Sequence, residues 1–258
     1  MRWSLTTIIA ALAALALGAG VAVAGTVVGT DGPETLTGTS EPDQLYGEAG
    51  DDVLEGLAGN DYLEAGSGAD TVRGGAGPDL VIAGTGNDSV DAGSANDVVY
   101  AGAGDDTVLG GAGRDTLFGQ AGTDRLFGGA GADVLYASAG DDVADGGSGA
   151  DRLTSEDGDA TLIGGRGNDV ITAAGGDVTV RGGAGRDRIR TGAGQDDVSG
   201  GGGADGIATG AGDDKVSSRD GRRDRVNCGP GEDTVRADRA DILRGCETVV
   251  VDGGGPFG

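Results

Sequence analysis

The sequence predicts an all-β protein, a two-sheet β-solenoid of parallel strands with 18 residues in each coil. Three observations predict it: a period of nine residues, an Asp at the same place in almost every repeat, and a bulky aliphatic residue two positions later. From position 43 to position 214, eighteen of the twenty positions spaced by nine hold Asp, and 160 and 178 do not. The repeats share the pattern Gly-Gly-x-Gly-x-Asp-x-aliphatic-x, in which Ala144 is the one small residue at the aliphatic place.

The two halves of each repeat favour different backbone conformations. Glycines allow the tight conformations of a turn, whereas the x-aliphatic-x segment is long enough only for a very short strand. Such a strand is not stable alone, so the units must stack and bury their aliphatic side chains together. If two units form one coil, strands 18 residues apart lie in one parallel sheet at about 4.8 Å, and two sheets enclose a thin aliphatic core.

In this arrangement the turns stack into two columns, and each column receives one Asp per coil. Carboxylates at that spacing repel one another strongly without a countercharge. Turns rich in oxygen, with one carboxylate per layer, suit a hard cation that takes six to eight oxygen ligands, which indicates calcium rather than magnesium or zinc. The alternative is that Asp simply favours turns, but Asn and Gly would then alternate freely with Asp at this place, and they do not.

The nonapeptide resembles that of the repeats-in-toxin (RTX), or haemolysin-type, calcium-binding family, over residues 29 to about 236. The resemblance implies a parallel β-roll in which turn carbonyls and the sixth-position Asp hold multiple calcium ions. Carried over to this chain, the carboxylate ligands are Asp43, Asp52, Asp61, Asp70, Asp79, Asp88, Asp97, Asp106, Asp115, Asp124, Asp133, Asp142, Asp151, Asp169, Asp187, Asp196, Asp205, Asp214 and Asp233. Glycines that match the turn positions include Gly74, Gly110, Gly111, Gly128, Gly129, Gly146 and Gly182.

Two repeats lack the Asp and carry Ala160 and Val178 instead. These positions are 18 residues apart, so a two-unit coil makes them neighbours in one column. Our hypothesis is that calcium is missing from this part of the column, and that Ala160 packs on Val178 and lengthens the strand.

Near the end of the chain, the period slips by one residue in 218–227, where Asp224 stands one place late. Cys228 and Cys246 are 18 residues apart. If the coil continues, they lie on adjacent turns, within the roughly 4.4 to 6.8 Å that a disulfide requires between Cα atoms. We therefore predict a disulfide-closed cap that hides the last strand edge. Two free thiols are the alternative.

The residues that flank the aliphatic place point outward, and one sheet is apolar there. Its outward residues include Leu80, Ile82, Val98, Tyr100, Phe118, Val134 and Tyr136, whereas the other sheet is mostly polar. One interpretation is that the aromatic rings support neighbouring strands. The other is a flat patch for self-association, for a cell-surface partner or for a glycan.

The chain divides into four predicted segments. Residues 1–24 have the charge, apolar run and small-residue cleavage site of a secretory signal, so cleavage is expected after Ala24 and the protein is expected to be extracellular. An uncleaved membrane anchor is the alternative, and no other segment could cross a bilayer. Residues 25–227 are the predicted calcium-binding roll, 228–250 the cap and 251–258 a flexible tail.

The charge points to cations as partners. The net charge is −25, and it becomes −26 when residues 1–24 leave with Arg2 and no acid. Such a chain repels nucleic acid and anionic lipid. High charge with few aromatic residues also allows disorder, but the strict aliphatic period argues against permanent disorder.

The sequence has no His and no out-of-phase cluster of catalytic residues, so we expect no enzyme activity. A thin core and strong self-repulsion predict that folding requires the calcium found outside cells. We expect a secreted structural or adhesive component of a bacterial surface or matrix. The alternative is a non-catalytic remnant or module of an RTX-type protease, lipase, epimerase or toxin.

Overall fold

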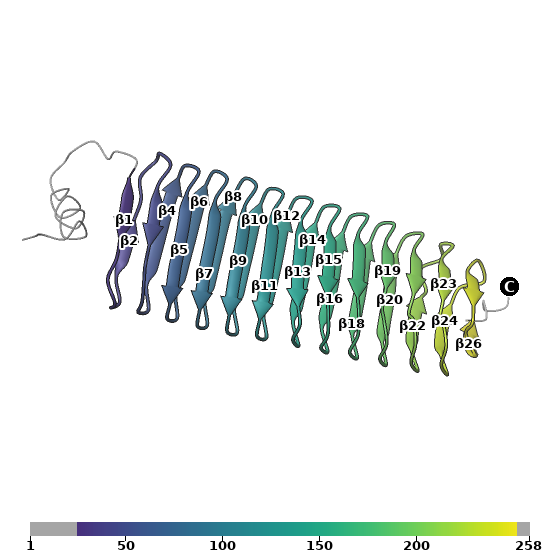
Figure 1. Ribbon diagram of the computed structural model, residues 1–258. Coiled ribbons are helices and arrows are strands. Elements are labelled where there is room, and N and C mark those ends of the chain that lie inside the picture. Colours follow the sequence, from purple (N-terminus) through teal and green to yellow (C-terminus); the bar gives the residue numbers. More distant parts are fainter. Residues whose placement is uncertain (1–24, 252–258) are drawn as a thin grey trace, which may run out of the picture.

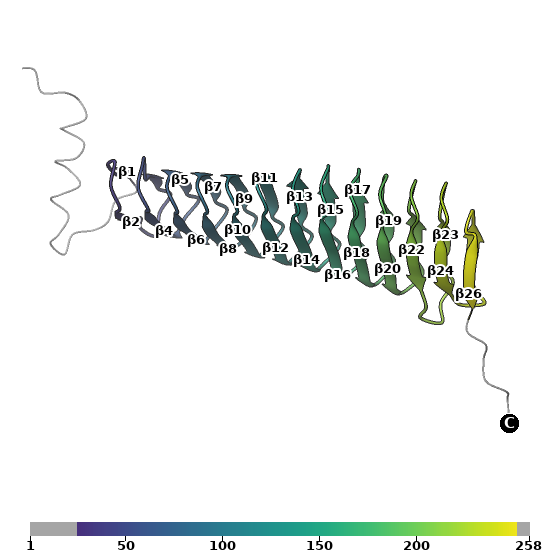
Figure 2. The ribbon, with the colours of Figure 1, turned by 90° about the horizontal axis from the view of Figure 1, so that it is seen from below.

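The computed structural model describes residues 25–251, which form two parallel sheets of 13 strands each, with no helix in this range. Strands alternate between the sheets along the chain, so each strand pairs with the strand two elements later (Figure 1). Figure 2 shows the odd-numbered strands along one side of the molecule and the even-numbered strands along the other. The predicted two-sheet parallel solenoid is therefore confirmed.

We call the sheet of odd-numbered strands sheet A. Its strands are β1 (Thr26–Val28), β3 (Gln44–Tyr46), β5 (Tyr62–Ser67), β7 (Leu80–Thr85), β9 (Val98–Ala103), β11 (Thr116–Ala121), β13 (Val134–Ser138), β15 (Arg152–Ser155), β17 (Val170–Ala173), β19 (Arg188–Arg190), β21 (Gly206–Ala208), β23 (Arg225–Asn227) and β25 (Ile242–Arg244).

We call the sheet of even-numbered strands sheet B. Its strands are β2 (Thr35–Thr37), β4 (Val53–Ala58), β6 (Thr71–Ala76), β8 (Ser89–Ser94), β10 (Thr107–Ala112), β12 (Arg125–Ala130), β14 (Val143–Ser148), β16 (Thr161–Arg166), β18 (Thr179–Ala184), β20 (Asp197–Gly202), β22 (Lys215–Ser218), β24 (Thr234–Ala237) and β26 (Thr248–Val251).

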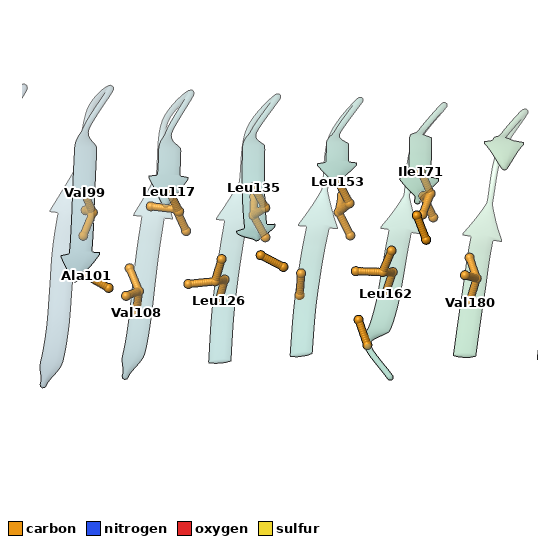
Figure 3. Close-up of a cluster of buried hydrophobic side chains, with 14 of the residues drawn as sticks. Val99, Ala101, Val108, Leu117, Leu126, Leu135, Leu153, Leu162, Ile171 and Val180 are labelled. Carbon is orange, nitrogen blue, oxygen red and sulfur yellow. The ribbon is translucent and has the colours of Figure 1, made fainter. Parts of the chain in front are cut away.

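The core is a single aliphatic layer between the two sheets. The residue two positions after each repeat Asp points inward, and side chains such as Leu117, Leu126 and Leu135 are completely buried. Figure 3 shows these residues meeting from the two sheets along several coils. Even Ala144 is fully buried at its aliphatic place. Because each coil contributes so few large side chains, the apolar burial per residue is small, as the sequence predicted.

The strands are longer than the expected three residues in the central coils. Strand β10 runs through Gly110 and Gly111 and pairs Gly111 with Gly129 of β12. Glycine allows this continuation because the coils approach closely: a Cβ on Gly111 would lie 2.0 Å from the carbonyl oxygen of Gly93. The paired glycines predicted to form turns therefore lie within strands, and the turn is limited to the few residues around Gly113.

The pairing register follows the sequence period. Neighbouring strands pair residues 18 apart as far as β20 with β22, for example Val108 with Leu126, except at an irregularity where Ser138 of β13 pairs with Ser155 of β15, 17 residues later. Gly206 of β21 then pairs with Arg225 of β23, 19 residues later. The predicted slip in 218–227 is thus confirmed. The turn absorbs the extra residue, and both sheets continue.

The predicted disulfide is present near the end of the described range, but it does not hide the last strand edge. Cys228 and Cys246 are bonded, with 5.3 Å between their Cα atoms. The last coil nevertheless continues the two sheets and does not fold across their edges. Strand β26 has β24 as its paired neighbour in the described range, and Val249, Val250 and Val251 are 42%, 45% and 42% exposed.

Some predictions concern residues beyond the described range. The signal segment 1–24 with its cleavage after Ala24 lies outside it, and so does the predicted tail after Val251. No helix within 25–251 has the length and apolar character needed to cross a bilayer.

Candidate metal sites

The turn aspartates form two continuous ladders, one along each turn edge of the solenoid. Within a ladder, the backbone N–H of one Asp donates to Oδ1 of the Asp in the next coil, as from Asp97 to Asp115 at 2.9 Å. The A ladder, which precedes the strands of sheet A, contains Asp43, Asp61, Asp79, Asp97, Asp115, Asp133, Asp151, Asp169, Asp187, Asp205 and Asp224. The B ladder precedes sheet B and contains Asp52, Asp70, Asp88, Asp106, Asp124, Asp142, Asp196, Asp214 and Asp233.

The second oxygen of every ladder carboxylate except that of Asp43 has no partner. All ladder aspartates are at most 4% exposed. In nineteen of them, Oδ2 is buried and accepts no hydrogen bond. A buried carboxylate oxygen without a partner is costly. Bound cations would be partners for the unpaired oxygens of both rows.

Backbone carbonyls converge on these free oxygens. The residue five positions before each ladder Asp points inward, and we call its place the facing position. At Gly128, a Cβ would lie 2.7 Å from Oδ2 of Asp133 and 2.8 Å from the carbonyl oxygen of Gly146 in the next coil. At Gly74, the corresponding distances are 2.6 Å to Oδ2 of Asp79 and 2.5 Å to the carbonyl oxygen of Ala92. A glycine here leaves open a space bordered by two hard oxygens, which fits calcium chemistry.

Side chains alone do not form a metal cage. Within residues 25–251, no group of three or more Asp, Glu, His or Cys side chains comes together in a way that could hold an ion. One carboxylate per coil must therefore combine with backbone carbonyls, as calcium accepts and zinc does not favour.

The facing position differs between the two ladders. In the A ladder up to Asp205 it is Gly except at Ala92, the glycines being Gly38, Gly56, Gly74, Gly110, Gly128, Gly146, Gly164, Gly182 and Gly200. In the B ladder it is Gly only at Gly47 and Gly119, and a larger residue stands before every other Asp: Ala65, Ala83, Ala101, Ala137, Thr191, Thr209 and Cys228. In most coils of the B ladder, a methyl or larger group therefore occupies the space that glycine leaves open in the A ladder.

The B ladder is also interrupted. Ala160 and Val178 take two of its places, and both are buried at 1% exposure within the aliphatic core. The ladder resumes where the N–H of Val178 donates to Oδ1 of Asp196 at 3.1 Å. The expected strand lengthening is wrong. Strands β16 and β18 begin at the same repeat position as the other sheet B strands, and the preceding β15 and β17 have only four residues because they stop before this turn.

Burial changes the acidity of the ladder carboxyls. Desolvation raises the pKa of Asp97 to about 7, and the neighbouring charges of Asp115 and Asp79 add to the rise, although the donated backbone N–H opposes it. Desolvation likewise raises the pKa of Asp151 to about 7 and that of Asp88 and Asp124 to about 6. Each value is raised because the ionised form is removed from water without a countercharge.

The structure brings together all the aspartates that the sequence singled out, with two differences at the ends of the A ladder. Asp43 has no free oxygen, because Oδ2 accepts from the backbone N–H of Thr39 at 2.6 Å and from its hydroxyl at 2.9 Å. Asp224, absent from the expected ligand set, has a buried free Oδ2, and its Oδ1 accepts from the N–H of Asp205 at 2.8 Å. Its signal was present in the sequence, because Val226 follows it at the aliphatic spacing.

A second, outer ladder was also missed. The residue just before a ladder Asp, or before Ala160 or Val178, is often Asp or Asn, and its Oδ1 accepts from the backbone N–H one coil later. Examples are Asp141 with the N–H of Asp159 at 3.0 Å and Asp159 with that of Asp177 at 2.9 Å. These side chains are exposed. The variable fifth position of the repeat thus also holds successive turns together.

The apolar face of sheet A is present, and its aromatic residues are stacked. The rings of Tyr100 and Phe118 lie 4.7 Å apart with planes 4° from parallel, and Phe118 and Tyr136 lie 4.7 Å apart at 3°. Because the ring faces cover one another from coil to coil, the rings present their edges outward. This geometry favours support of neighbouring strands over a flat platform for sugar rings.

The comparisons with known proteins agree with the repeat. The family model of the RTX calcium-binding nonapeptide repeat matches residues 28–63, 49–81, 64–99, 82–117, 118–153, 154–177 and 179–207. A search of curated proteins finds no match.

Proposed function

The chain belongs to the RTX calcium-binding nonapeptide repeat family, and from this membership we propose that it is a secreted structural protein whose folding depends on extracellular calcium. RTX repeats bind calcium, and this roll is a calcium-binding structural module. Proteins with such repeats are typically extracellular.

The buried, unpaired Oδ2 atoms carry the assignment of the ligands. We assign the carboxylate ligands of calcium to the aspartates of both ladders from Asp52 to Asp233. This set includes Asp224, which was not among the ligands expected from the sequence. Asp43 is a weaker member, because both of its oxygens already accept hydrogen bonds. Carbonyl oxygens such as that of Gly146 border the same space and supply further hard ligands. We expect no ion at Ala160 and Val178, whose side chains have no oxygen.

Calcium supplies the countercharge that the two ladders require. Without it, the buried carboxylates of successive coils repel one another along each ladder. An ion that binds the folded state and not the unfolded chain shifts the equilibrium toward folding, so binding and folding become one event. The chain would then remain unfolded where calcium is scarce and fold where calcium is abundant.

Several observations support a structural role over a catalytic one. The sequence contains no His, which removes the commonest general base, and the arginine-lined groove on sheet A has no Ser, Cys, Thr or Lys among its lining residues. The half-buried apolar residues from Leu80 to Tyr136 give sheet A a surface for a structural or adhesive role at a bacterial surface or in a matrix. An RTX enzyme module without its catalytic part is the second candidate, and no feature of residues 25–251 favours it over the first.

Far-UV circular dichroism of the chain from Gly25, titrated with calcium and separately with magnesium, tests this function. We expect a transition from coil to β structure with calcium at up to millimolar concentration, and none with magnesium. The double variant Asp115→Asn with Asp133→Asn should need several-fold more calcium. The control Asp91→Asn with Asp145→Asn, on the outer face of sheet B, should behave as the unchanged chain. A chain fully folded in chelator at pH 7 would contradict the proposal.

A further inference from the structure

The outer face of sheet A changes from apolar to basic along the molecule. Between β7 and β25 none of its outward strand residues is acidic, although the chain has 43 acids. Toward the C-terminal end, the outward residues include Arg188 and Arg190 of β19, Arg225 of β23 and Arg244 of β25, all of them exposed. In Figure 1 these strands lie in the green and yellow part of the molecule.

These arginines lack the acidic neighbours that Arg73 and Lys215 of sheet B have. Arg73 of sheet B lies between Glu55 and Asp91 on the neighbouring strands and forms an ion pair with Glu55 at 3.1 Å. Lys215 lies opposite Asp197. None of the four sheet A arginines forms an ion pair with a residue of the described range. Their clustering raises the electrostatic free energy unless negative charge from elsewhere approaches them.

The arginines border a groove of about 760 Å³. Strand β21 forms its floor, because it presents Gly206 and Ala208 outward between β19 and β23. Arg188 and Arg225 lie in register on either side of Gly206. They are two strand spacings apart, about 9.6 Å along the solenoid.

A row of acidic residues on the same chain has a spacing that matches the spacing of the groove arginines. Asp141, Asp159 and Asp177 are exposed and lie in three successive turns, just before β14, β16 and β18. Each fixes one oxygen by accepting the backbone N–H of the next coil, at 2.7 to 3.0 Å. Asp141 and Asp177 are two coils apart, the same separation as Arg188 and Arg225. The row borders the interruption at Ala160 and Val178, where the B ladder has no carboxylate.

We propose that the arginine groove of one molecule binds the acidic row of a second copy of this chain. Asp141 and Asp177 pair with Arg188 and Arg225, while Asp159 lies over Gly206, where no side chain obstructs it. The row lies on a turn edge and the groove on a sheet face of one rigid solenoid, so the two cannot meet within a molecule. Because the joined surfaces differ, the association is heterologous and can continue from copy to copy.

The proposal rests on the calcium-dependent fold proposed above. At a net charge of −25, two copies repel each other, and bound calcium reduces that repulsion. Association is therefore expected only after calcium has folded the chain, and added salt should weaken it because exposed charge pairs are screened.

Charge reversal with rescue tests this pairing. Sedimentation velocity in calcium should show oligomers of the unchanged chain. It should show monomers for the groove variant Arg188→Glu with Arg225→Glu, and for the row variant Asp141→Arg with Asp177→Arg. We expect a rise in the dissociation constant of at least about tenfold for each. Mixing the two variants should restore association between them, because each supplies the intact surface that the other lacks.

Matched controls separate this pairing from general charge effects and from failure to fold. Arg125→Glu with Arg181→Glu, on sheet B, changes the net charge equally and should leave association intact. Circular dichroism in calcium reports the folding of each variant, so a folding defect is distinguished from loss of association. The proposal is overturned if the folded, unchanged chain is monomeric at all calcium concentrations, if the groove variant associates as before, or if the mixed variants remain monomeric.

Discussion

The A ladder and the B ladder share their spacing, burial and hydrogen bonds, yet they differ in the residue that faces the free carboxylate oxygen. Nine of the ten A-ladder aspartates up to Asp205 face glycine, whereas most of the B ladder faces Ala, Thr or Cys. The B ladder also contains the break at Ala160 and Val178. We therefore propose that cation binding in this molecule depends on a position without a ligand side chain, where the absence of a Cβ keeps space open beside the oxygens.

The largest expected effect is the pH dependence of folding without calcium, and it should be similar for the two ladders. Burial raises the pKa of aspartates in both, to about 7 for Asp97 and about 6 for Asp124, from an ordinary value of 3.8. A carboxyl whose pKa is raised by folding stabilises the fold fully below its unfolded value and loses that contribution as pH rises through its folded value. In chelator, the chain should therefore be folded near pH 4 and unfold between about pH 6 and 7.

Circular dichroism from pH 3 to 8 in chelator measures this transition. In calcium the dependence should reverse, because calcium binds deprotonated carboxylates and its affinity rises with pH. If the calcium-free chain remains a coil at pH 4, neutralising the ladders is not sufficient for folding.

Repairing the interruption should have the next largest effect. Ala160→Asp with Val178→Asp places two carboxylates in the missing positions of the B ladder. In excess calcium, equilibrium dialysis should find up to two additional bound ions. In chelator, the variant should unfold at a lower pH than the unchanged chain, because the two new buried carboxylates have no partner when they ionise.

The matched control is Ala160→Asn with Val178→Asn, which changes the shape of the side chains almost identically without adding charge. It should bind no additional ion. An equal ion count for the Asp and Asn variants would show that the ladder position alone does not create a site.

Exchanging the facing residues should have the smallest effect, and it tests the comparison directly. Gly110→Ala with Gly128→Ala places methyl groups 2.7 Å from the free oxygens of Asp115 and Asp133. Overpacking of this kind costs about 1 to 3 kcal/mol, although Gly→Ala within a strand otherwise stabilises by about 0.5 to 1 kcal/mol. The calcium midpoint of folding should therefore rise several-fold.

The reciprocal pair, Ala83→Gly with Ala101→Gly, opens the corresponding space in the B ladder. We expect it to bind at least as many ions as the unchanged chain, measured by dialysis at a calcium concentration below saturation. Equal changes in both pairs would mean that the two ladders are equivalent for calcium.

The sequence was sufficient to predict the architecture because every coil repeats the same pattern of residues. The spacing of the aspartates and aliphatic residues predicted the two sheets, the 18-residue coil, the core and the two columns of carboxylates. It also predicted the disulfide, since Cys228 and Cys246 are one coil apart. Repetition makes such predictions strong, because each coil is constrained by its neighbours through the same contacts.

Other features depend on where each side chain points, which spacing does not reveal. The pairing of coils through Gly110 and Gly111 gave six-residue strands, because the close approach of successive backbones extends the hydrogen bonding. The facing position became evident only from the contacts that a Cβ would make. Asp224 joined the A ladder because a turn absorbed one extra residue, which a fixed period of nine does not anticipate.

The alternation of the two sheets also limits how a chain of this kind can change in length during evolution. Loss or duplication of 18 residues removes or adds one whole coil and leaves every later residue on its own side. Loss of nine residues would move every later repeat to the opposite turn edge. The arginines of sheet A would then lie on sheet B, and glycine-facing aspartates would join the ladder whose other members face alanine. Genetic variation by whole coils preserves the surfaces of this molecule, and variation by single repeats exchanges them.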